Sequence, residues 1–148
     1  MKLKITLIIL VVLVAHYVVA GNHEDKPLDF KNVKVLRVYD GDTIFVNINK
    51  IPPVLGYDLG VRLRGIDTPE IRGKCDHEKE LAKQAKILVL EKIIKNKYKV
   101  DLKNCERGKY FRIVCDVYAP DNIGDMLIEN NLAYNYEGGT KIDWCADQ

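Results

Sequence analysis

The spacing of apolar residues changes along this chain, and that change constrains the fold more than any other feature. Between residues 33 and 66, apolar side chains form short runs with strand-like alternation. Across residues 76–96 they recur near helical spacing, with Lys and Glu between them. The helical positions are Leu81, Ala85, Leu88 and Ile93. This pattern predicts one long amphipathic helix, capped at Asp76.

Turn signals divide the strand runs from one another. Residues 33–38 and 44–48 flank Asp-Gly-Asp and predict a hairpin, followed by a Pro-containing loop at 50–58. Residues 59–66 predict a third strand, which ends before Pro69 because proline cannot donate to a sheet. After the helix, residues 98–102 and 111–118 predict two more strands joined by a polar connection at 103–109, and residues 123–130 predict a short helix.

Five short strands with a helix between the third and fourth have the order of a five-stranded Greek-key barrel of the oligonucleotide- and oligosaccharide-binding (OB) type. We therefore expect an α+β fold: an OB barrel with a long helix between strands 3 and 4 and a short C-terminal helix. A fold alone does not define a function.

The amino-terminal residues have the composition of a targeting segment. Lys2 and Lys4 precede a short apolar run that is interrupted by His16 and continues to Ala20, which is typical of a secretory signal. A membrane-spanning helix needs about 20 predominantly apolar residues, so we favour cleavage after Ala20 over an anchor formed by residues 5–20. The expected organisation is a signal peptide at 1–20, a polar leader at 21–31 and one domain at 32–148. We expect a secreted or periplasmic protein that meets the membrane only transiently, with a membrane-anchored protein as the alternative.

Charge balance excludes bulk attraction to nucleic acid. Cleavage would remove two of the 23 basic residues in the chain of 148, and the 21 left would equal the 21 acidic ones. Any affinity for nucleic acid must then come from a local basic patch or a bound cation.

The cysteines predict disulfides rather than a metal site. Cys75, Cys105, Cys115 and Cys145 contain no CxxC pair, which argues against structural zinc. In an exported chain they would form bridges, with buried or free thiols as the alternative. Sequence leaves three pairings open; we favour Cys75 with Cys145, which would tie the chain end to the body.

Acidic residues follow two of the predicted strands. They are Asp40, Asp42, Asp67 and Glu70. Each short group alone is an ordinary turn, but adjacent strand ends would gather carboxylates that repel one another unless a cation joins them. Oxygen ligands without His or Cys suit calcium. We expect Asp42, Asp67 and the Thr68 carbonyl to bind Ca²⁺, Asp40 to orient the site or hold a water, and Glu70 to position or deprotonate an attacking water.

Two arginines could bind a phosphate beside these acids. Arg62 precedes Asp67 on the same strand, and Arg112 begins a later one. A guanidinium can bind two phosphoryl oxygens at once. For Arg64 we expect only the usual role of an arginine on a strand, a solvated or ion-paired surface residue.

Three segments resemble the signature blocks of the staphylococcal (thermo)nuclease family. They are VYDGDT at 38–43, VRLRGIDTPE at 61–70 and KYFRIV at 109–114, in the family's order and spacing, and the similarity covers about residues 33–136. The resemblance implies a calcium-dependent phosphodiesterase that cuts DNA and RNA with little sequence preference and leaves 3′-phosphate ends.

The same resemblance implies a role for each matching residue. Asp42, Asp67 and Thr68 correspond to calcium ligands, Arg62 and Arg112 to phosphate-binding arginines, and Glu70 to the carboxylate that assists water. Substrate-binding residues would be Lys109, Tyr110, Tyr134 and Tyr136. Aromatic rings stack on any base; the alternative for Tyr134 and Tyr136 is packing at the barrel rim.

Two departures from the family pattern bear on the site. Phe111 stands where the family usually has Gly, so the backbone there could differ and move Arg112. Gly138-Gly139-Thr140 interrupts the region where family members often carry a third helix.

We therefore expect a secreted, calcium-dependent, sugar-nonspecific endonuclease that has no stable protein partner. The alternative is a noncatalytic OB-fold module that binds nucleic acid or protein, but such a module has no need of all five acid and arginine residues. A membrane-tethered structural protein would leave that arrangement unexplained.

Overall fold

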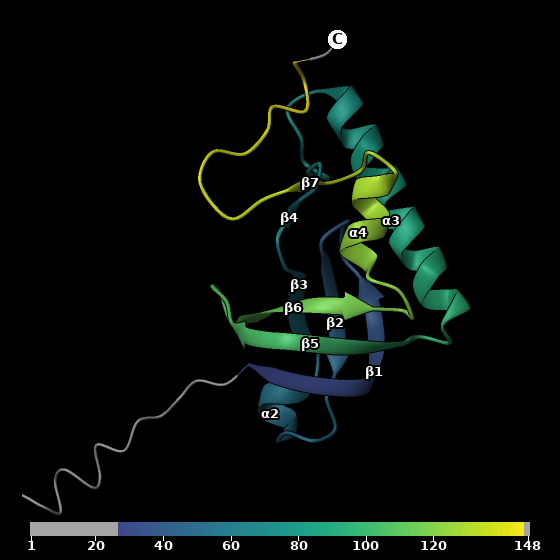
Figure 1. Ribbon diagram of the computed structural model, residues 1–148, viewed down its shortest axis with the longest axis vertical. Coiled ribbons are helices and arrows are strands. Elements are labelled where there is room, and N and C mark those ends of the chain that lie inside the picture. Colours follow the sequence, from purple (N-terminus) through teal and green to yellow (C-terminus); the bar gives the residue numbers. More distant parts are fainter. Residues whose placement is uncertain (1–26, 147–148) are drawn as a thin grey trace, which may run out of the picture.

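Five strands close into a barrel in the computed structural model, which describes residues 27–146. The barrel order is β1-β2-β3-β6-β5, and β5 pairs back with β1 (Figure 1). Neighbours are antiparallel except β3 and β6, which run parallel. The strands are β1 (Leu28–Val38), β2 (Thr43–Asn47), β3 (Leu59–Leu63), β5 (Lys99–Arg107) and β6 (Arg112–Tyr118). The predicted α+β OB barrel is confirmed.

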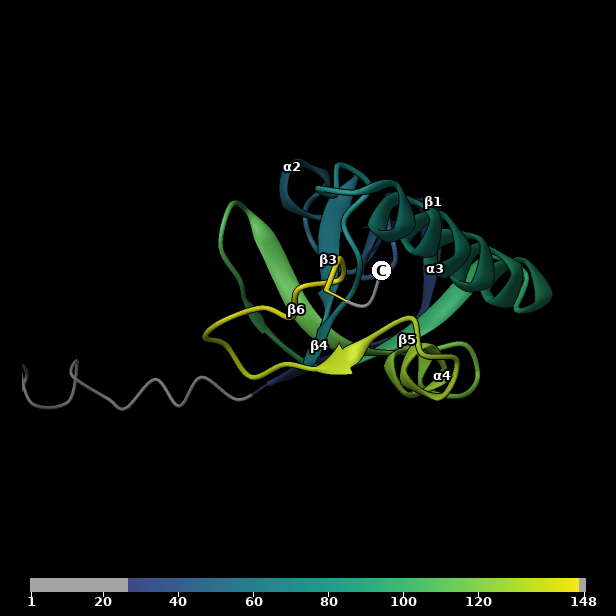
Figure 2. The same cartoon turned by 90° about the horizontal axis from the view of Figure 1, so that it is seen from above.

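The remaining elements lie around this barrel. They are α2 (Pro53–Gly56), β4 (Ile66–Asp67), α3 (Asp76–Lys95), α4 (Ile123–Glu129) and β7 (Tyr134–Asn135). β4 and β7 form a separate two-stranded sheet, and Figures 1 and 2 show it near α4, with α3 alongside. The short α2 lies at the opposite end of the barrel from this small sheet (Figure 1). Among the described residues, no helix is both long and apolar enough to cross a membrane.

Helix α3 covers the barrel with a stripe of small and branched residues. Ala82, Ala85, Val89 and Ile93 are fully buried. Leu81 and Leu88, two of the predicted helical positions, are only partly buried against the core. The predicted cap is also wrong: Cys75 is the N-cap residue, its Sγ accepting from the Glu78 N–H, and Asp76 is the first helical residue.

The strands and loops differ from the sequence prediction at four places. β1 begins at Leu28, inside the segment predicted as a polar leader, because residues 28–30 pair with β5. β5 continues to Arg107 through the predicted connection at 103–109, because Cys105 pairs with Leu28 of β1 and residues 106–107 pair with β6. The predicted strand 59–66 is broken by a turn in which Gly65 has a φ of 71°, a conformation that glycine adopts without steric cost. The loop 50–58 contains α2.

Two disulfides are present, and no described cysteine is free. The favoured bridge between Cys75 and Cys145 is confirmed. Cys105 and Cys115 join the neighbouring strands β5 and β6. The expected signal peptide lies outside the described residues, so it stays a prediction.

Candidate active site

The acidic side of the site is built where β1 and β3 lead into tight turns. Asp42 and Thr68 are each 3% exposed, and Asp67 is 2% exposed. Gly41 permits the close approach of the two turns: a Cβ at this position would lie 3.2 Å from the Thr68 Cβ and 2.9 Å from the Ala85 Cβ. The Asp40–Asp42 turn therefore packs directly against the segment that carries Asp67 and Thr68.

Arg62 connects the two acidic segments. Its Nη1 lies 2.6 Å from Asp42 Oδ2, and its Nη2 donates to the Ile66 carbonyl at 3.4 Å, next to Asp67. Thr43 Oγ1 donates to the other Asp42 oxygen at 2.8 Å. Both oxygens of the buried Asp42 carboxylate thus have partners. Arg64, by contrast, forms ion pairs with Glu106 and Asp116, which confirms its predicted structural role.

Asp67 is buried with fewer partners than Asp42. Within residues 27–146, neither a backbone group nor a neutral side chain donates a hydrogen bond to its carboxylate oxygens. Its one charged contact is Lys141, whose Nζ lies 2.7 Å from Oδ1 and 2.7 Å from Glu70 Oε1. Burial lowers the pKa of Lys141, but the contacts with Asp67 and Glu70 outweigh burial and raise the pKa above its ordinary value.

Asp40 contacts the backbone of its own turn. Its Oδ1 accepts the Asp42 backbone N–H at 3.1 Å. Burial, together with the negative charge of Asp42, raises the pKa of Asp40 from 3.8 to about 6, although the Asp42 N–H acts in the opposite direction. A negative charge on Asp40 is therefore less stable in this turn than it would be on a carboxylate in water.

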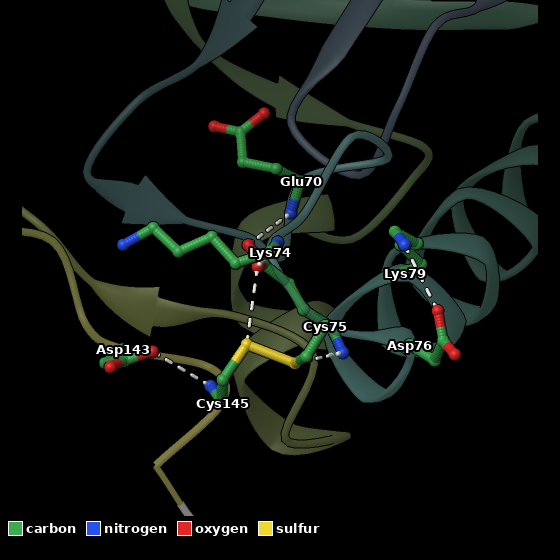
Figure 3. Close-up of a disulfide and its surroundings, with 8 residues drawn as sticks. Glu70, Lys74, Cys75, Asp76, Lys79, Asp143 and Cys145 are labelled. Carbon is green, nitrogen blue, oxygen red and sulfur yellow. Dashed lines mark hydrogen bonds and ion pairs between the residues drawn. A yellow bond between two sulfur atoms is a disulfide. The ribbon is translucent and has the colours of Figure 1, made fainter.

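Glu70 lies on a loop that Glu78 holds in place. Glu78, in the first turn of α3, is 7% exposed and accepts the backbone N–H groups of Glu70 at 3.2 Å and Lys74 at 2.8 Å. Figure 3 shows the Glu70 side chain extending away from the nearby Cys75–Cys145 disulfide. Glu78 was not predicted from the sequence, where its only signal is a carboxylate in the first turn of a predicted helix.

The basic side of the site is a cavity of about 450 Å³ lined by four cationic side chains. These are Arg62, Arg107, Lys109 and Arg112. The structure therefore brings the two predicted phosphate-binding arginines and Lys109 to one cavity. Arg107 was not predicted, because it fell in the segment interpreted as a polar connection. A concave surface with this charge is suited to a phosphate.

Arg112 follows a tight turn between β5 and β6. The Arg112 N–H donates to the Lys109 carbonyl at 3.2 Å, and φ is 56° at Tyr110 and 57° at Phe111. Positive φ at both central residues is typical of a type I′ turn, which favours Asn-Gly. Phe111 thus occupies a glycine-type conformation while Arg112 still reaches the cavity.

The tyrosines do not gather at one place. Tyr110 is 87% exposed, and its ring lies 5.9 Å from the Arg112 guanidinium carbon. Tyr134 is paired with Asp67 across β4 and β7, and its ring lies 4.9 Å from Trp144. Tyr136 donates from its hydroxyl to the Gly139 carbonyl. Despite these contacts, Tyr134 is 42% exposed and Tyr136 is only partly buried.

The acidic side has the chemistry of a hard-cation site. Buried carboxylates need compensating charge, which Arg62 supplies to Asp42 and Lys141 supplies to Asp67 in this structure. An oxygen-only set from Asp42, Asp67 and the Thr68 carbonyl fits calcium. Cys75, Glu78 and Cys145 also lie close together, but their two sulfurs form a disulfide and are not available as thiolate ligands.

Comparison with known proteins identifies the family of this chain. The family model described as staphylococcal nuclease homologue matches residues 60–143, more than half of the chain. The chain therefore belongs to this nuclease-type family, as predicted. The match covers Arg62, Asp67, Glu70, Arg112 and Lys141 but begins after Asp42. No curated protein matches the chain.

Proposed function

We propose that this protein is a secreted, calcium-dependent endonuclease that hydrolyses DNA and RNA without sugar preference and leaves 3′-phosphate ends. One observation carries the proposal: Arg62 contacts the buried Asp42 and also lines the cavity that contains Arg112. Because a single side chain belongs to both halves, a phosphate bound in the cavity would lie beside the acidic turn. Membership of a nuclease-type family supports nucleic acid as the substrate.

The proposed roles follow from the placement of each group. Asp42, Asp67 and the Thr68 carbonyl would hold the calcium ion, which supplies positive charge against a phosphodiester. Arg62 and Arg112 would bind the nonbridging phosphate oxygens and stabilise the charge that develops during displacement. Glu70, which is more than half exposed, would accept a proton from the attacking water. Tyr110, Tyr134 and Tyr136 would contact bases or sugars of the substrate.

Chelation of calcium tests this proposal. Purified protein should degrade single- and double-stranded DNA and RNA when calcium is present, and activity should stop when EGTA is added. Full activity in EGTA would remove calcium from the mechanism. Tight binding of oligonucleotides without any cleavage would instead favour the noncatalytic binding module.

Secretion needs its own measurement. Mass spectrometry of the mature amino terminus should show a chain that begins at Gly21. An intact Met1 in a membrane fraction would favour the anchored form.

A further inference from the structure

Residues 137–146, which we call the C-terminal strap, are fixed to the body at both ends. The strap follows β7, where Tyr134 pairs with Asp67 of β4. At its far end Cys145 is bonded to Cys75, the N-cap of α3. Between these points the strap loops outward and returns towards the start of α3 (Figure 1). Both attachments therefore lie next to the acidic side of the site.

The strap places one ammonium group between two carboxylates of the site. Lys141 Nζ lies 2.7 Å from Oδ1 of Asp67 and 2.7 Å from Oε1 of Glu70. The Lys141 side chain is 42% exposed, whereas Asp67 is 2% exposed, so the ammonium reaches inward to a buried charge. Among the described residues, Lys141 is the one cation in contact with Asp67. It is therefore the group that neutralises this carboxylate in the structure.

A lysine and a calcium ion cannot both satisfy the same carboxylate without cost. Both cations would be attracted to the single negative charge of Asp67, and they would repel each other strongly because water screens charges poorly at this buried carboxylate. Calcium binding at Asp67 thus requires the Lys141 ammonium to withdraw or to lose part of its contact. Any such exchange lowers the apparent calcium affinity.

We propose that Lys141 is a tethered counter-ion that competes with calcium for the Asp67 carboxylate, and that the Cys75–Cys145 disulfide maintains this competition. The inference rests on the proposed calcium site. The disulfide matters because a tethered group acts at a high effective concentration, which falls when one end of the tether is released. Glu70 holds the other side of the ammonium, so withdrawal of Lys141 would also free Glu70 to act on water.

Removal of the ammonium should strengthen calcium binding. Lys141→Met keeps most of the side-chain length and removes the charge, and we expect the calcium dissociation constant from calorimetry to fall about tenfold, as for loss of one competing ion pair. Lys141→Arg keeps the charge and should behave nearly as the wild type. Lys92→Met is the matched control, because Lys92 forms an ion pair of the same 2.7 Å length with Asp121, outside the site.

Release of the strap should act in the same direction. The double substitution Cys75→Ser with Cys145→Ser should also tighten calcium binding, because Lys141 is then no longer held over Asp67. The matched control is Cys105→Ser with Cys115→Ser, which removes the bridge between β5 and β6 and leaves the strap attached. If either double variant fails to fold, Lys141→Met still tests the proposal.

The outcomes separate this inference from the proposed function. No calorimetric calcium binding by either the wild type or Lys141→Met would overturn both the calcium site and the inference. Equal calcium affinities of the wild type and Lys141→Met, with calcium-dependent cleavage intact, would overturn the inference alone. Weaker calcium binding in Lys141→Met would also overturn it, because Lys141 would then support the metal site rather than compete with it.

Discussion

The acidic and basic sides of the site differ in how firmly the fold holds them. Asp42 and Asp67 are almost completely buried and lie in turns that pack against each other through Gly41. Arg112, in contrast, follows a turn whose central residues are 87% and 69% exposed. Metal ligation needs several oxygens at fixed positions, whereas a long guanidinium side chain can reach a phosphate from a less constrained backbone. Buried packing therefore fixes the carboxylates more firmly than it fixes Arg112.

Arg62 is the strongest test of this contrast because it belongs to both sides. Arg62→Ala and Arg112→Ala should each lower kcat by about 10²–10³-fold, as expected for the loss of a group that stabilises developing charge. Only Arg62→Ala should also change calcium affinity, since Asp42 loses its partner at 2.6 Å. Nuclease kinetics and calcium calorimetry on both variants provide the measurement. A shift in calcium affinity of the same size in Arg112→Ala would show that the two sides are not separate.

Glu78 tests how the acidic side is held. Glu78→Ala should lower the free energy of unfolding by about 1–3 kcal/mol, because two backbone N–H groups lose a buried acceptor. Activity should fall as well, since one of these groups belongs to Glu70. Urea unfolding and turnover on the same preparation measure the two effects.

The matched control for this prediction is Glu80→Ala. Glu80 lies on the same helix in an exposed i,i+3 pair with Lys83, and an exposed pair of this kind contributes less than about 1 kcal/mol. Equal loss of stability in the two variants would contradict the positioning role of Glu78.

Local patterns in the sequence predicted much of the fold. The hairpin of β1 and β2, the long helix α3 and the short helix α4 were all predicted from periodicity and turn residues. One error occurred where pairing is decided by distant residues: the start of β1 is a strand because Leu28 pairs with Cys105 and Phe30 with Leu102 of β5. Cys75 replaced Asp76 as the cap, which periodicity could not distinguish.

The candidate site divides along the same line. Asp40, Asp42, Asp67 and the two arginines stand in short motifs, so their types and spacing could be interpreted without a structure. Lys141, Glu78 and Arg107 could not be predicted in this way. Lys141 lies beside the site in a segment that is fixed by a disulfide between residues 70 positions apart. Glu78 contacts the Glu70 loop from helix α3. Arg107 is placed by the extension of β5 beyond its predicted end. Contacts made by tertiary structure leave no local pattern in the sequence.

The smallest predicted effect concerns the exposed turn on the basic side. A non-glycine residue in the left-handed backbone conformation destabilises the fold by about 1–2 kcal/mol. Substitution by glycine removes this cost, but part of the gain is lost because glycine loses more conformational entropy on folding. Phe111→Gly should therefore raise the free energy of unfolding by about 0.5–1 kcal/mol and leave kcat unchanged, because Arg112 reaches the cavity in either case. Phe111→Ala removes the ring but keeps the strained backbone, so it should give no such gain in urea unfolding. If Phe111→Gly instead lowered kcat, the aromatic ring would have a role in holding substrate, although it is exposed in the structure.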